Sequence, residues 1–242
     1  MACTRTEAER PGSGSALTPT RLAKLQAWFS PSFPIGSFGY SHGLEWVVEA
    51  QEVRDAGSLA EWVAGTLRHG AGRSDAILLA ELWRAVHEQD WELADEISVL
   101  AAALQPTYER RLESLNQGRA FLAAVAAGWP AAAIDTFQAR CGGEQSYAVA
   151  AGVATAAHEV PLDSALVASL HAFAANLVSA GVRLVPLGQT DGVRIMAALE
   201  PLIAEIAQEA QSSSLDDLGS ATFLADIASM NHETQYTRLF RS

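Results

Sequence analysis

The side chains best suited to metal or acid–base chemistry in this sequence are six histidines scattered along the chain: His42, His69, His87, His158, His171 and His232. None of them belongs to an HExxH motif or to a Cys/His spacing of the kind that holds zinc. A histidine without neighbouring ligands is usually a surface residue or a hydrogen-bonded core residue. The spacing therefore predicts neither a metal site nor a catalytic histidine.

Nucleophiles and phosphate-binding loops are equally sparse. No GxSxG motif occurs, and Cys141 precedes two glycines in a pattern that favours a small buried cysteine over a reactive one. Lys24 is the only lysine, so no GxxxxGK[ST] loop can be written and a Schiff-base enzyme would have to depend on that residue. We therefore predict a protein without catalytic residues and without a bound cofactor.

The most distinctive stretch runs from Ser30 to Glu49 and reads SPSFPIGSFGYSHGLEWVVE. Its glycines allow unusual backbone geometry, and Gly39→Val should damage folding if Gly39 has a positive φ. One interpretation is a shaped loop whose aromatic residues fill the core, with Ser41 as the N-cap of the next helix. The other is a recognition surface, with Phe38, Tyr40, Ser41 and Glu45 as candidate contacts. A third, weaker interpretation is a ligand pocket under the glycine-rich residues 36–43.

Two further segments carry unusual polar or aromatic side chains. Arg183 and Gln189 flank an apolar turn, where they are expected to cap helix ends or to line a contact surface. The C-terminal end combines aromatic residues and arginines, which are enriched at interface hot spots. It either packs on its own domain or folds onto a partner, and its candidate contact residues are Tyr236, Arg238, Leu239, Phe240 and Arg241. We expect few core contacts there, so its removal should leave the fold intact.

Composition bounds the class of protein. The chain has 242 residues, 49% of them hydrophobic, and a formal net charge of −12, which disfavours nucleic-acid binding because phosphate backbones would be repelled. No run of about 18 apolar residues is present, so no membrane-spanning helix is expected. The two cysteines form no disulfide framework, which favours a cytoplasmic protein.

Apolar residues recur at helical spacing over most of the chain, and strand signals are scarce, so we predict an all-α, single-domain bundle of about ten helices. Residues 1–20 are expected to be a disordered tail, 21–230 the helical domain and 231–242 a partner-binding tail. Ser58 to Glu61 resembles a capping box. In the helix after Pro106, Tyr108 and Leu112 are expected to face inward and Arg110 and Glu113 outward. Pro201 predicts a kink or a boundary.

Three separated blocks carry a resemblance to a known family. They are SPSFPIGSFGYSHGLEWVVE, then NLVSAGVRLVPLGQTDG followed by LEPLI, and a terminal YTRLFRS. Together they resemble the UreF family of urease accessory proteins, from about Leu22 to Ser242.

The resemblance implies an all-α homodimer that acts as a non-catalytic chaperone of urease maturation. Its expected partners are the accessory D (or H) protein, the nickel-carrying GTPase known as the G protein, and apo-urease. By resemblance, Arg238 to Arg241 would become ordered on the D protein, and the opening loop and the Arg183–Gln189 turn would lie at interfaces. The chain alone is expected to bind nickel no better than a generic protein. The alternatives are an α-helical enzyme and a generic helical adaptor with a pocket under residues 36–43.

Overall fold

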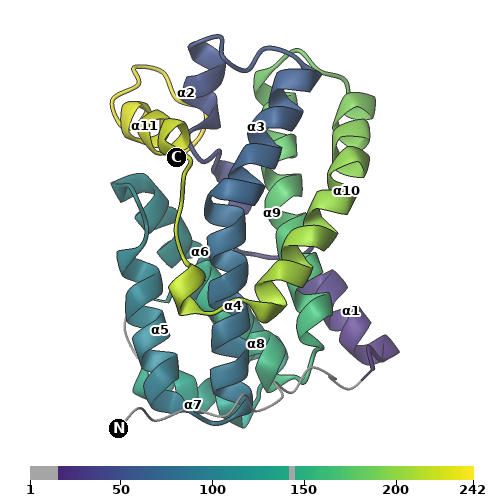
Figure 1. Ribbon diagram of the computed structural model, residues 1–242, viewed down its shortest axis with the longest axis vertical. Coiled ribbons are helices and arrows are strands. Elements are labelled where there is room, and N and C mark those ends of the chain that lie inside the picture. Colours follow the sequence, from purple (N-terminus) through teal and green to yellow (C-terminus); the bar gives the residue numbers. More distant parts are fainter. Residues whose placement is uncertain (1–15, 142–144) are drawn as a thin grey trace, which may run out of the picture.

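A computed structural model describes residues 16–141 and 145–242, and the expected disorder of residues 1–15 lies outside that part of the chain. Within it, eleven α-helices and two short 3₁₀ helices form one bundle without strands, which confirms the all-α prediction (Figure 1). The 3₁₀ helices are η1 (Ser37–Gly39) and η2 (Leu215–Asp217). The α-helices are α1 (Pro19–Trp28), α2 (Leu44–Glu49), α3 (Ala56–His69), α4 (Ala71–His87), α5 (Trp91–Ala103), α6 (Tyr108–Gly128), α7 (Ala132–Arg140), α8 (Tyr147–Ala157), α9 (Leu162–Leu184), α10 (Gln189–Ser212) and α11 (Phe223–His232).

The centre of the bundle is the pair α4 and α8. Almost every residue of α8 is small, and eight successive residues from Ala148 to Thr155 are buried. A Cβ atom on Gly152 would lie 3.0 Å from the carbonyl oxygen of Leu79, so the two helix backbones approach closely. Helices α6, α7 and α9 pack around α8 as well. The small side chains of α8 thus allow it to form the crowded centre of the bundle.

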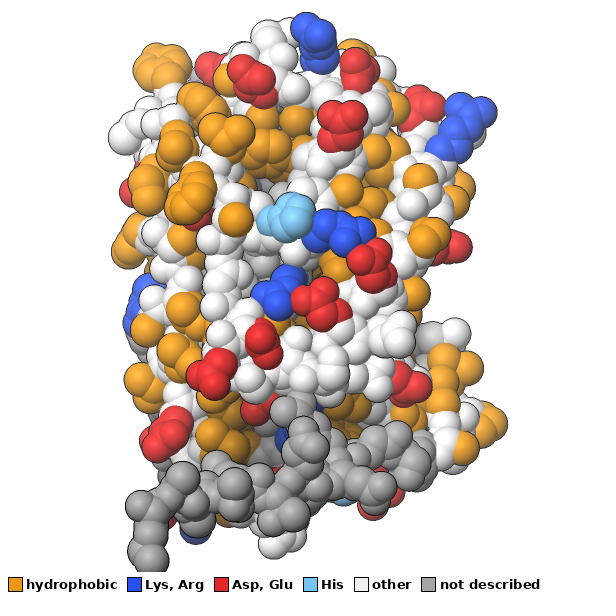
Figure 2. Space-filling view, viewed as in Figure 1, with side chains coloured by type: hydrophobic (Ala, Val, Ile, Leu, Met, Phe, Trp, Pro, Cys, Tyr) orange, Lys and Arg blue, Asp and Glu red, His pale blue; other side chains and the backbone are white. Residues whose placement is uncertain are grey.

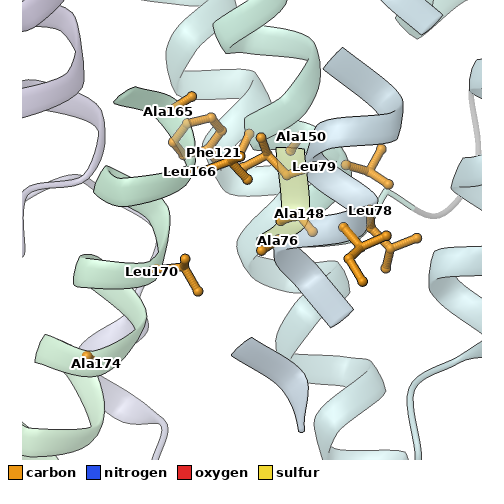
Figure 3. Packing of buried hydrophobic residues seen from close by; sticks show 14 of the residues in the cluster. Ala76, Leu78, Leu79, Phe121, Ala148, Ala150, Ala165, Leu166, Leu170 and Ala174 are labelled. Carbon is orange, nitrogen blue, oxygen red and sulfur yellow. The ribbon is translucent and has the colours of Figure 1, made fainter. Parts of the chain in front are cut away.

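Side chains from four helices meet in the core around this pair. Figure 3 shows residues of α4, α6, α8 and α9 turned toward one another, among them Leu79, Phe121, Ala150 and Leu166. Helix α9 is the one helix in the described residues that is long and apolar enough to cross a membrane. Its apolar character has a simpler cause, because Leu166, Leu170 and Leu177 pack into this core.

Several predicted helix starts are displaced. Pro19 and Thr20 belong to α1, which Thr18 caps, rather than to a disordered tail. Ser41 is not an N-cap, because α2 begins at Leu44 after Gly43 at φ +76°. The capping box of α3 joins Asp55 to Ser58, so the predicted Ser58–Glu61 pair is wrong.

Three further features concern the start of α4, the proline of α10 and the glycines at 36, 39 and 43. Helix α4 begins at Ala71, directly after the Gly70 that separates it from α3. Pro201 lies inside α10 and does not end it. Gly39 lies within η1 and its φ is not positive, whereas Gly36 and Gly43 have φ of +73° and +76°. Neighbouring residues and tertiary packing thus moved these elements by a few positions without changing their type.

The predicted orientation of α6 is wrong at its first turns. Arg110 and Glu113 are buried, whereas Tyr108 and Leu112 are exposed. The cause is an ion pair: Arg110 Nη1 lies 2.7 Å from Glu113 Oε2, one turn further along the helix. Buried charges are tolerated when they are paired and hydrogen-bonded, and apolar periodicity alone does not reveal this.

Candidate partner-binding site

The C-terminal segment, defined here as residues 233–242, lies against the opening loop of residues 30–43. The backbone N–H of Arg241 donates to the carbonyl oxygen of Gly39 at 2.8 Å. Ser41 holds the last residue twice, because its backbone N–H and its hydroxyl both donate to the Ser242 carbonyl oxygen, at 2.7 and 2.5 Å. Figure 1 shows the C-terminus beside α2 and α11. Two segments about 200 residues apart therefore form one unit.

Glu45 is the main anchor of the C-terminal segment. Its carboxylate, which is buried, accepts the backbone N–H of Leu239 at 2.6 Å and that of Phe240 at 2.8 Å. Hydrogen bonds to a charged acceptor are stronger than neutral ones, so these two contacts fix the backbone of the segment. The first turn of α2 presents the carboxylate, because Ser41 accepts the backbone N–H of Glu45 at 3.3 Å.

Arg183, near the end of α9, lies between two aromatic rings. Its guanidinium carbon is 3.6 Å from the ring centroid of Phe38 and 4.4 Å from that of Phe240. Its Nη1 donates to the Phe38 carbonyl oxygen at 2.9 Å, and burial lowers its pKa. A cation between two aromatic faces joins the opening loop, α9 and the C-terminal segment in one contact.

A buried network of charges lies beneath this unit. Glu113 on α6 receives Nε2 of His42 at 2.7 Å and the hydroxyl of Ser242 at 2.7 Å, in addition to Arg110. Burial would raise the pKa of Glu113, but the charges of His42 and Arg110 and the hydrogen bonds lower it to about 2. Burial lowers the pKa of His42, and Arg110 adds to that effect. Glu113 is therefore the ionised centre of the network.

A second buried set lies around the end of α11. His232 is fully buried between Glu109 and Glu45, and Arg238 donates to Glu109 Oε1 at 2.8 Å. Sequence reasoning missed Glu109, His232 and Ser242. The one sequence feature that pointed to this buried set was the run of charged residues at the start of α6, which is too dense to lie entirely on the exposed face of a helix.

The candidate contact residues divide into a buried and an exposed group, with Arg183 of intermediate burial between them. Tyr40, Ser41, Glu45 and Phe240 are buried, so in this conformation they hold the C-terminal segment rather than offer a surface. The exposed group is Phe38, Gln189, Tyr236, Arg238, Leu239 and Arg241. Gln189 is the first residue of α10, and the structure shows no hydrogen bond from its side chain to the other candidates. Tyr236 is fully exposed.

The expectation of few core contacts at the C-terminal end is wrong. Phe240 is 4% exposed and Ser242 is fully buried, and both belong to the contacts described above. The segment packs on its own domain because Glu45 and Ser41 provide acceptors and donors for its backbone. Aromatic and arginine residues in the sequence did not distinguish this arrangement from a free tail.

Exposed apolar side chains gather next to this unit. Figure 2 shows them at the upper left of the view, where Figure 1 places α11. Large hydrophobic residues that are exposed between positions 223 and 239 are Phe223, Leu224, Ile227, Met230, Tyr236 and Leu239. Such a concentration on a folded protein is typical of a protein-binding surface.

A cavity of about 190 Å³ lies beneath the opening loop, at the place of the predicted pocket. Phe38, His42, Asp75 and Phe173 are among its lining residues. Burial raises the pKa of Asp75 to about 6. Within residues 16–141 and 145–242, no group of three or more His, Cys, Asp or Glu side chains is arranged to hold a metal ion.

Comparison with known proteins identifies the family. The family model described as UreF matches residues 53–200. A urease accessory protein UreF of Rhodopseudomonas palustris strain BisA53 is 50% identical over 98% of this chain and 100% of its own length. One from Xanthobacter autotrophicus is 51% identical over 97% of both chains, and one from a Bradyrhizobium species, strain BTAi1, is 48% identical over 98% of this chain.

The fold, the site and these relatives define a non-catalytic, all-α accessory factor of urease maturation. The chain belongs to the UreF family. Membership confirms the resemblance of the three sequence blocks, and it sets aside the enzyme alternative.

Proposed function

We propose that this chain is a scaffold that binds the accessory D (or H) protein and recruits the nickel-carrying GTPase, the G protein, to apo-urease. It acts as a homodimer in the cytoplasm. The names of the relatives support a place among the urease accessory proteins. The contacts of the C-terminal segment support a role in holding partners, because its buried residues fix it to the domain while its other side chains are exposed.

The single observation that carries this proposal is the exposed apolar surface between Phe223 and Leu239. Aromatic residues and methionine are enriched at protein interfaces, and this surface contains Phe223, Met230 and Tyr236. An apolar surface in contact with water is costly unless a partner covers it. We assign this surface to the D protein, as the resemblance implies for the C-terminal end.

The remaining candidate contacts have different roles in this proposal. Phe38 is 66% exposed above the Arg183 guanidinium, so it presents a rigid ring to a partner. Gln189 offers a polar contact at the start of α10. Nickel is treated as cargo of the GTPase, since no three-residue ligand group is present in the described part of the chain. In this proposal the chain positions the partner proteins, and the GTPase coordinates the metal.

The test is the binding of purified D protein to the full chain. The variant Tyr236→Ala/Leu239→Ala removes two outward side chains, which are fully exposed and 66% exposed, and should leave the fold intact. Loss of an aromatic hot spot costs about 2 kcal/mol or more, so affinity should fall at least about tenfold.

The matched control is Val99→Ala, because Val99 on α5 is also 66% exposed. Light scattering after size exclusion, with and without the D and G proteins, reports the complexes and the dimer. Equal affinity of the double variant and the control for the D protein would refute the assignment of the surface.

A further inference from the structure

The cavity beneath the opening loop shares part of its lining with a second cavity, to which residues of α11 contribute. The first has a volume of about 190 Å³ and the second a volume of about 100 Å³. Three residues line both of them: His42, Asp75 on α4 and Arg110 on α6. A cavity of about 150 Å³ in a protein core is large enough to hold benzene. The first cavity therefore has room for a small organic molecule.

The Asp75 carboxylate is the feature of this cavity that most needs an explanation. Within residues 16–141 and 145–242 it makes no hydrogen bond and no ion pair. Burial raises its pKa to about 6, although the charge of Arg110 acts in the opposite direction. Buried carboxylates are normally paired or hydrogen-bonded, because an unpaired one destabilises the fold when it is ionised. A carboxylate that lines a cavity without such a partner is a candidate ligand-binding group.

His42 supplies a second acceptor. Its side chain is 10% exposed, and its Nε2 lies 2.7 Å from Oε1 of Glu113, whose pKa is lowered to about 2. Nε2 therefore carries the proton that this contact with an ionised carboxylate requires. Burial lowers the pKa of His42, so the ring is neutral and Nδ1 carries a lone pair. This Nδ1 is buried, and no donor in the described part of the chain reaches it.

The charges that line the first cavity do not balance. Asp75 and Glu113 are negative, Arg110 is positive and pairs with Glu113, and the neutral His42 adds no charge. One negative charge is left, and it belongs to Asp75. A ligand with one positive charge and N–H donors is therefore complementary to the two acceptors. Aromatic rings, whose faces attract cations, provide much of the remaining lining. They belong to Trp28, Phe29, Phe38, Tyr147 and Phe173.

We propose that this cavity binds a small organic cation, an ammonium group on an apolar body, with Asp75 as its counter-charge. The entrance lies between the opening loop and α9, where the lining residues Pro31, Phe38 and His171 are exposed. A divalent metal ion fits less well, because the described residues contain no group of three or more His, Cys, Asp or Glu side chains arranged to hold one. The proposal does not depend on the assignment of the apolar surface to the D protein.

The probe is benzylamine, which is an ammonium ion at neutral pH, and benzyl alcohol is its neutral counterpart of similar shape. Saturation-transfer NMR titrations of the full chain at pH 7.5 measure both affinities. Pairing the ammonium group with an ionised carboxylate should make benzylamine bind at least about tenfold more tightly than benzyl alcohol. Equal affinities, or no binding of benzylamine, would overturn the proposal.

The variant Asp75→Asn keeps the shape of the side chain and removes its charge. It should weaken the binding of benzylamine at least about tenfold and leave that of benzyl alcohol unchanged. The control Asp216→Asn, at an exposed carboxylate of η2, should change neither affinity. Removal of an ionised carboxylate whose pKa is raised should stabilise the fold at this pH, so a urea midpoint at or above the native one shows that the variant is folded.

Two results with these variants would contradict the proposal. One is a folded Asp75→Asn variant that binds benzylamine as tightly as the native chain does. The other comes from adding Ni²⁺ alone as a competitor. If Ni²⁺ displaces benzylamine from the native chain at a lower concentration than benzylamine itself needs to bind, the Asp75 carboxylate belongs to a metal site instead.

Discussion

Deleting residues 238–242 should destabilise the domain, contrary to what its position at the chain end suggests. Burial of Phe240 contributes about 2–3 kcal/mol. The two backbone N–H groups on the Glu45 carboxylate contribute about 1.5–3 kcal/mol each, and the buried hydrogen bonds of Ser242 add about 1 kcal/mol or more. Against these gains, ordering the backbone costs about 1–2 kcal/mol for each residue.

Ordering five residues offsets the hydrogen-bond contribution of about 4–7 kcal/mol. The burial of Phe240 then remains as a net stabilisation of about 2–3 kcal/mol, which for a domain of this size corresponds to a fall in Tm of about 5–10 °C. The assay is urea denaturation at pH 7 followed by circular dichroism, with thermal melting as a second measure. The variant Tyr236→Ala is the control, because that side chain is fully exposed and its loss should change the free energy of unfolding by less than about 0.5 kcal/mol. A truncated chain with the native midpoint would refute the reasoning.

Three other substitutions test the buried groups. Asp75→Asn should stabilise the protein by about 2 kcal/mol at pH 8 and by almost nothing near pH 4. Burial raises the pKa of Asp75 to about 6, so its carboxyl destabilises the fold once it is ionised. Urea titrations at both pH values measure the difference. Arg110→Met should cost about 3 kcal/mol by removing the guanidinium counter-charge of the buried Glu113 carboxylate. Arg119→Met, at an exposed position on the same helix, should be silent in the same titration. Gly43→Ala should lower Tm markedly because its Cβ would lie 2.7 Å from the α11 backbone at a positive φ, while Gly39→Ala, whose Cβ meets nothing closer than 3.9 Å, should melt like the native chain.

Local sequence patterns determine most of the fold. Apolar spacing and the scarcity of strand signals predicted the helices. The predicted helix boundaries were wrong where two neighbouring residues could each act as the N-cap. Asp55 caps α3 in place of Ser58 because its carboxylate accepts the backbone N–H of Ser58 at 2.8 Å. Such competition depends on the entry angle of the chain, which a periodic pattern does not contain.

The site could be predicted only as a list of segments. The sequence indicated the opening loop, the end of α9 and the C-terminal end, and the structure brings them together around Glu45 and Arg183. It gave no sign of which side chains would be buried, because their partners in the C-terminal segment lie 195 residues from Glu45 and 129 residues from Glu113. The Arg110–Glu113 pair is local, but the contacts of Glu113 with His42 and Ser242 leave no local signature, and the buried face of α6 was therefore predicted as the outer one.

The C-terminal segment can serve both roles that the sequence left open, because its side chains alternate. Phe240 and Ser242 are buried, whereas Leu239 and Arg241 between them are exposed. The buried pair can therefore close the domain while the exposed pair remains available. Packing on its own domain therefore does not compete with recognition. It presents Leu239 on an ordered backbone, which reduces the entropy cost that a free tail would pay on binding.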